Sequence, residues 1–231
     1  MGSRMTAVRT VVLSAALLLV ALTPVHAREP ATAGLTPDEV DKINRGEVVV
    51  KTRVYSIADG KRAVTIKGYC VINKPPDAAW AVMLDYEKFH EFMPRLSKVK
   101  VLEKTKDTMK VTETVSMPVG TLTHTLDLKF YPTQGRVAWT LDKSRKHDIA
   151  DTSGTWEFLP YRRGGTVVRY TSTVDSGMIV PKFLEEQLIS YDLPGVLSSI
   201  RRRTESDGTW TKEQSPAAEV SGAPDKALSA P

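Results

Sequence analysis

Two residues with acid–base side chains fall on the apolar faces of two successive alternating segments. In residues 121–131 the even positions are apolar except for His124, while the odd positions from 121 to 129 are threonines and charged residues. In the preceding segment, 109–117, Glu113 alternates with valines in the same way. Because side chains alternate across a strand, both residues are expected to point inward. A turn at residues 118–120 would place Glu113 opposite His124, close enough for a hydrogen bond.

A glutamate–histidine pair on a buried face has two interpretations. It could orient a hydroxyl or carbonyl group of a ligand, or act as an acid–base pair in an aldol-type cyclisation. It could equally be a buried pair in which each residue satisfies the other and which fixes the strand register. Trp139 and Trp156 also fall on the apolar faces of their segments, either as walls of a cavity or as plain core.

Other catalytic chemistry has little support in the sequence. The single cysteine, Cys70, has no histidine or acid beside it to stabilise a thiolate, so a buried and inert thiol is expected. The loop 145–151 holds one histidine and two aspartates without the spacing of a known metal site. Phosphate-binding loops, dinucleotide-binding glycine motifs and Ser-His-Asp contexts are absent from the sequence. We therefore expect neither a metal nor a cofactor.

The elements that would position these residues follow from periodicity and turn residues. A helix is predicted to begin at Thr36-Pro37 and end at Gly46, and helical periodicity also spans 78–92. A final amphipathic helix covers 181–203, with Pro194-Gly195 as the place for a kink. Strands are predicted at 47–57, 63–72, 97–103, 109–117, 121–131, 136–141, 154–159 and 166–174, the last six as an antiparallel meander. A curved sheet covered by one long helix would bury this α+β pattern.

The two ends of the chain are predicted to lie outside the folded domain. Residues 1–27 combine Arg4 and Arg9 with an apolar run and a small-residue site ending at Ala27, which is typical of a cleavable secretory signal peptide. An uncleaved N-terminal anchor is the alternative. Residues 207–231 are rich in Pro, Ala, Ser and Gly without apolar periodicity and are predicted to be a disordered tail. This leaves one domain, 28–206, in a periplasmic or secreted protein.

The charge distribution argues against nucleic-acid binding. The formal charge of the chain is +5, to which Arg4 and Arg9 of the signal contribute two, and the remaining basic residues are interspersed with acids. The exception is the run 201–203 at the end of the last helix, where cations complement the helix dipole. Four apolar residues before that helix could contact a membrane transiently: Met178, Ile179, Val180 and Phe183.

Three segments, taken in order, share the character of one known superfamily. They are "INKPPDAAWAVMLDYEKFHEFMPRLSKVKVLE", "SGTWEFLP" followed by "GGTVVRYTSTVDSG", and "PKFLEEQLISYDLPGVLSSIRRR". Over residues 48–203 the chain resembles the START-like (SRPBCC) superfamily, in particular its coenzyme Q-binding and polyketide cyclase branch. The resemblance implies a helix-grip fold, a curved antiparallel β-sheet wrapped around a long C-terminal α-helix.

The resemblance also implies a cavity between the sheet and the last helix. Its walls would include Phe89 and Phe92, which could equally be core, and Phe183, Gln187 and Tyr191 of the last helix. The expected function is that of an exported, monomeric, non-enzymatic carrier of a hydrophobic small molecule: a lipid, a quinone, a sterol-like molecule or another isoprenoid. The alternative is an enzyme of the polyketide cyclase or aromatase type, which export disfavours because such substrates are carrier-bound in the cytoplasm. A third reading is an interaction domain with a filled core.

Overall fold

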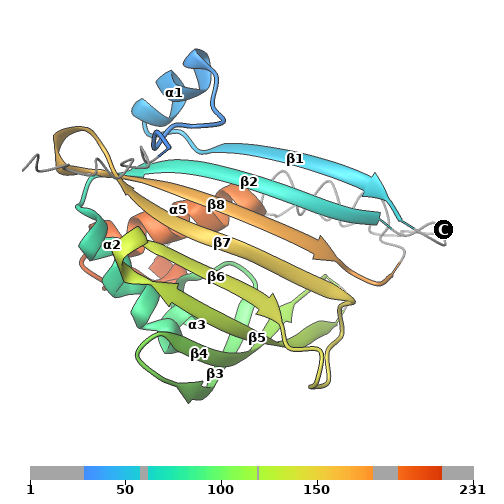
Figure 1. Ribbon diagram of the computed structural model, residues 1–231. Coiled ribbons are helices and arrows are strands. Elements are labelled where there is room, and N and C mark those ends of the chain that lie inside the picture. Colours follow the sequence, from blue (N-terminus) through green and yellow to red (C-terminus); the bar gives the residue numbers. More distant parts are fainter. Residues whose placement is uncertain (1–28, 58–61, 119, 179–191, 215–231) are drawn as a thin grey trace, which may run out of the picture.

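An eight-stranded antiparallel sheet is the central element of the structure, a computed structural model that describes residues 29–57, 62–118, 120–178 and 192–214 (Figure 1). The strand order is β1-β2-β8-β7-β6-β5-β4-β3, so the meander from β3 to β8 confirms the sequence prediction and closes against the β1–β2 hairpin. The strands are β1 (Val49–Ser56), β2 (Arg62–Ile72), β3 (Leu96–Lys104), β4 (Thr108–Ser116), β5 (Thr121–Tyr131), β6 (Arg136–Leu141), β7 (Asp151–Pro160) and β8 (Thr166–Asp175).

The first helix, α1 (Pro37–Asn44), covers part of the outer face of the sheet. It begins with the predicted capping box, in which the Glu39 amide donates to the Thr36 hydroxyl and the Thr36 amide donates to the Glu39 carboxylate. Ile43 on this helix is fully buried and packs in a small cluster with Val49, Tyr69 and Val167. This helix therefore lies at the β1 edge, on the face opposite the main core.

The segment between β2 and β3, where helical periodicity spans 78–92, contains three short helices. They are α2 (Pro76–Leu84), η2 (Tyr86–Lys88) and α3 (Phe89–Phe92). The break lies at Asp85, where φ is −92° and ψ is 50°, outside the helical region. Because the chain turns there, Tyr86 and the two phenylalanines become buried, whereas Leu84, predicted on the same face, is 38% exposed.

The last helix, α5 (Leu193–Glu205), packs against the inner face of β1 and β2, on the same side of the sheet as α2 and α3 (Figure 1). Gly68 permits the close approach of this helix, because a Cβ at that position would lie 2.4 Å from Leu197 Cδ1. Pro194 lies in the first helical turn, where proline costs no hydrogen bond. Residues 181–191 of the predicted helix lie outside the described residues. None of the described helices is long and apolar enough to cross a membrane.

Residues 207–214 pack against the domain, although composition assigns them to the disordered tail. Trp210 lies against the main core, and its carbonyl oxygen accepts a hydrogen bond of 2.7 Å from the guanidinium of the buried Arg203. Lys212 donates to the carbonyl of Leu96 at 2.9 Å. The ordered part of the domain thus extends past the expected boundary because a buried arginine needs acceptors that this segment supplies. Residues 215–231 lie outside the described part of the chain.

Truncation after Ser206 should lower the free energy of unfolding by about 2–4 kcal/mol, because it exposes core surface and removes an acceptor from the buried Arg203 guanidinium. Urea denaturation of the truncated and full-length chains measures this change. The matched control is a chain ending at Gln214, which keeps Trp210 and Lys212 and should match the full-length protein. Equal stability of the two truncated chains would contradict the assignment of 207–214 to the domain.

Candidate ligand-binding site

A buried glutamate on β4 contacts polar side chains from two elements. Glu113 pairs with His124 of β5 in the strand register, as the hairpin argument predicts, and the Oε2 atom lies 3.3 Å from Nε2 of the imidazole. The hydroxyl of Tyr86, on η2, donates to the other carboxylate oxygen, Oε1, at 2.7 Å. Each of the three residues is at most 9% exposed. We call the three side chains in contact, those of Tyr86, Glu113 and His124, the polar chain.

Tyr86 is the functional candidate that the sequence pattern does not reveal. It belongs to the segment "DYEKFHEFMP", but only the break of the helix at Asp85 turns its phenol toward β4. Phe89 holds it there, with its ring stacked on that of Tyr86 at 4.0 Å between centroids, and Phe92 packs edge-on against Phe89 at 5.1 Å. Phe89 and Phe92, 2% and 1% exposed, therefore act as core residues that support the polar chain.

Burial fixes the direction of the hydrogen bonds in the polar chain. Burial first, and the neighbouring Glu113 carboxylate second, raise the pKa of Tyr86 well above its ordinary value, so the phenol keeps its proton and donates. The carboxylate accepts this bond through Oε1, while Oε2 faces Nε2 of His124 at 3.3 Å. A neutral imidazole that presents the hydrogen of Nε2 to the carboxylate has its lone pair on Nδ1. That atom is buried and has no hydrogen-bond partner among the described residues.

Aromatic side chains line the inner face of β6, β7 and β8. The rings of Trp139 and Tyr170 stack with centroids 5.6 Å apart, and Trp156 contacts Tyr170 at 4.4 Å. Gly154 makes room for the Trp139 indole, since a Cβ there would lie 2.2 Å from its Cζ2 atom. Burial raises the pKa of Tyr170 to about 12, so this surface is uncharged. The structure thus brings Trp139 and Trp156 together, as parts of one aromatic surface.

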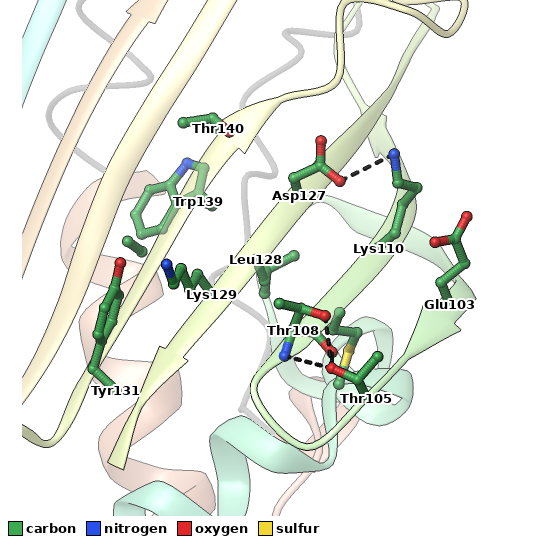
Figure 2. Close-up of a pocket in the computed structure, with 12 residues that line it drawn as sticks. Glu103, Thr105, Thr108, Lys110, Asp127, Leu128, Lys129, Tyr131, Trp139 and Thr140 are labelled. Atoms are coloured by element: carbon green, nitrogen blue, oxygen red, sulfur yellow. Dashed lines mark hydrogen bonds and ion pairs between the residues drawn. The ribbon is translucent and has the colours of Figure 1, made fainter. Parts of the chain in front are cut away.

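Two pockets formed by described residues lie away from the polar chain. A groove of about 450 Å³ lies over β4, β5 and β6, where Lys110 forms an ion pair with Asp127 at 3.0 Å (Figure 2). Lys110 also forms an ion pair with Asp142 at 2.5 Å. A hollow of about 410 Å³ lies between the start of α2 and the turn after β5. The predicted wall residues Phe183, Gln187 and Tyr191 lie outside the described residues. Within the described ranges, no group of three His, Cys, Asp or Glu residues could hold a metal ion.

Cys70 faces the last helix rather than the polar chain. Its Sγ atom lies 3.7 Å from the carbonyl oxygen of Leu197, and the residue is fully buried. Burial raises the pKa of the thiol to about 12. The thiolate that nucleophilic chemistry would need is therefore not formed at physiological pH.

The native protein should react with a thiol reagent at pH 8 on the order of a thousandfold more slowly than the urea-unfolded chain, because its thiolate fraction is lower by that factor. Time courses with 5,5′-dithiobis(2-nitrobenzoate) give both rates, with Cys70→Ser as the blank. One thiol should be titrated per unfolded chain. Rapid reaction of the folded protein would show that Cys70 is accessible and ionisable.

Tyr86→Phe should lower the free energy of unfolding by about 1.5–3 kcal/mol, because it removes a hydrogen bond to a buried carboxylate. Tyr161→Phe is the matched control: it also deletes a phenol hydroxyl, but one that bonds Asn44 at the surface, so its effect should stay within about 0.5 kcal/mol. Urea denaturation compares the two variants. Equal effects would mean that the Tyr86–Glu113 bond does not hold η2 to the sheet.

Comparisons with known proteins identify the family. The family model described as polyketide cyclase/dehydrase and lipid transport matches residues 63–205, more than half of the chain. No curated protein sequence matches the chain.

Solved structures share the fold at low sequence identity. A STAR-related lipid transfer protein from Xanthomonas axonopodis is 17% identical, with a TM-score of 0.53 over 66% of this chain and 98% of that one. The Zhui aromatase/cyclase of a Streptomyces species is 20% identical, with a TM-score of 0.51 over 63% and 98%. A START superfamily protein from Mycobacterium smegmatis is 13% identical, with a TM-score of 0.50 over 70% and 99%. The chain shares the helix-grip fold of these structures, and it belongs to the polyketide cyclase/dehydrase and lipid transport family.

Proposed function

We propose that this protein is an exported carrier that binds a hydrophobic molecule against the inner face of its sheet, beside the polar chain. The observation that carries the proposal is the composition of that face: a surface of aromatic and aliphatic side chains that contains a buried, hydrogen-bonded polar group. Binding sites for small apolar molecules have this composition, with few polar groups that fix orientation. The family, which includes lipid transport proteins, supports the same class of ligand.

The energetics favour transfer of an apolar molecule from water to such a face. Removing apolar surface from water contributes about 25 cal/mol per Å². The aromatic surface of Trp139, Trp156 and Tyr170 offers large contact area with side chains that lose little conformational freedom on binding. A lipid, a quinone, a sterol-like molecule or another isoprenoid fits this chemistry.

Export and membrane contact form part of the proposal. Residues 1–27 support export to the periplasm or beyond, because they have the layout of a cleavable signal. Val54 on β1 stands in register with Val64 and Val174 across β1, β2 and β8, and Val54 is 38% exposed. Met178, shortly after β8, is 47% exposed. These apolar side chains gather at one end of the sheet and could touch a membrane while a ligand passes.

A second candidate function is an enzyme of the cyclase type. The observation that favours it is Nδ1 of His124, which has no hydrogen-bond partner in the described part of the chain. An imidazole held by Glu113 through Nε2 could take a proton at Nδ1. Turnover would then be lost in His124→Gln, whereas a carrier would change only in affinity. Incubation of both proteins with a linear poly-β-ketone analogue and analysis for ring products separates the two functions.

Native mass spectrometry of the protein purified from the periplasm of a bacterial host tests the carrier proposal. We expect a mature chain beginning at Arg28 with one apolar adduct per chain, which organic extraction should release as a lipid or isoprenoid. The control is the chain without residues 1–27, made in the cytoplasm, stripped of lipid and mixed with quinones, sterols and phospholipids. An adduct-free periplasmic protein that also binds no member of this panel would refute the proposal.

A further inference from the structure

We infer that the ligand carries a hydroxyl group, which donates a hydrogen bond to Nδ1 of His124 while the apolar remainder lies along the inner face of the sheet. Resting on the carrier function proposed above, this specifies its ligand class: an amphiphile whose polar end is an alcohol or a phenol, as in fatty alcohols, isoprenoid alcohols, sterols and hydroquinones. Molecules whose polar end only accepts hydrogen bonds would be poor ligands.

The first step is the direction of the hydrogen bonds. An ionised glutamate can only accept: Oε1 of Glu113 accepts from the Tyr86 hydroxyl at 2.7 Å, and Oε2 faces Nε2 of His124 at the ion-pair distance of 3.3 Å. A lone pair on Nε2 would face the lone pairs of the carboxylate, so the imidazole presents a hydrogen there. A neutral imidazole carries one ring proton, so its other nitrogen is an acceptor. The polar chain thus sets the tautomer of His124.

The second step is that no described residue donates a hydrogen bond to this acceptor nitrogen. Nδ1 of His124 is the one buried side-chain nitrogen or oxygen without a hydrogen-bond partner among the described residues. His124 itself is 8% exposed, so bulk water does not satisfy the atom. Buried polar atoms in native proteins are nearly always paired, and an orphan acceptor weakens the folded state. The apparent defect is explained if a ligand completes the hydrogen bond.

The third step is the chemistry that could complete it. An acceptor nitrogen needs an O–H or N–H donor, and the rest of the ligand must suit apolar neighbours. On the inner face His124 alternates with Leu122 and Leu126, and Glu113 alternates with Val111 and Val115. A cationic amine would meet these aliphatic side chains with a full charge, whereas an alcohol donates without one. Esters, ethers, aldehydes and ketones would place a lone pair against the lone pair of Nδ1.

Matched probes that differ only at the polar end test the inference. The delipidated mature chain is titrated with 1-hexadecanol, 1-methoxyhexadecane and hexadecanal, and with farnesol and its methyl ether, by displacement of the apolar dye N-phenyl-1-naphthylamine. In the wild-type protein each alcohol should bind about tenfold more tightly than its ether or aldehyde, the effect of one additional buried hydrogen bond.

Two substitutions of His124 locate the preference on one atom. His124→Gln can keep an amide donor near the position of Nε2, toward Glu113, but has no acceptor at the position of Nδ1, so the ratio of alcohol to ether affinity should fall to about 1. His124→Asn places its side-chain oxygen near the position of Nδ1 and should retain part of the preference. Dye binding and urea denaturation of each variant show that the fold and the apolar site persist. If either variant fails to fold, the ratios of alcohol to ether affinity in the wild-type protein still test the hydroxyl preference.

The outcomes separate this inference from the carrier function. Tight binding of alcohols, ethers and aldehydes alike, or stronger binding of the aldehyde, would overturn the hydroxyl preference while the carrier function stands. A preference that survives unchanged in His124→Gln would overturn the role of Nδ1. Failure of the dye and of every probe to bind would overturn both the carrier function and the inference built on it.

Discussion

The carboxylate of Glu113 is the constraint on which the arrangement of the site depends. A charge in an apolar interior is tolerated only when hydrogen-bond donors replace the water it has lost. Here the hydroxyl of Tyr86 on η2 donates a hydrogen bond, and the imidazole of His124 on β5 lies at an ion-pair distance of 3.3 Å. The register of the β4–β5 hairpin and the break of the helical segment at Asp85 are both needed to bring them together.

The support of this carboxylate extends to the C-terminal end of the described chain. Phe92 packs under Phe89, which stacks on Tyr86, and the guanidinium of Arg203 lies over the Phe92 ring at 5.1 Å. Arg203 also forms an ion pair of 2.7 Å with Glu91 and donates to the carbonyl of Trp210. A continuous set of contacts therefore runs from residues 207–214, through α5 and α3, to the polar chain. Packing of this kind positions a site within tenths of an ångström because protein interiors are dense.

The sequence predicts the sheet and one half of the polar chain. Alternation along 109–117 and 121–131 places Glu113 and His124 on the same face, and the short turn between the strands sets their register. Both features depend on neighbouring residues and can be predicted from the sequence. The position of Tyr86 cannot be predicted in this way. Its role depends on a helix break at Asp85, where no proline or glycine stands, and on a contact with a strand that lies 27 residues further along the chain.

The sequence assigns residues 207–214 to the tail for a related reason. They have the composition of a tail, but they pack because the buried Arg203 requires acceptors and because Trp210 lies against the main core. The aromatic residues are an intermediate case. Helical spacing predicts that Phe89 and Phe92 are buried, but it does not distinguish a cavity wall from a core, and the distinction depends on the ring contacts around Tyr86.

A crystal structure of the protein purified without delipidation from the periplasm of a bacterial host tests the central claim most directly. The account predicts density for an apolar molecule along Trp139 and Trp156, with an oxygen atom at hydrogen-bond distance from Nδ1 of His124. An inner face closed by protein side chains alone, with Nδ1 bonded to one of them, would contradict it.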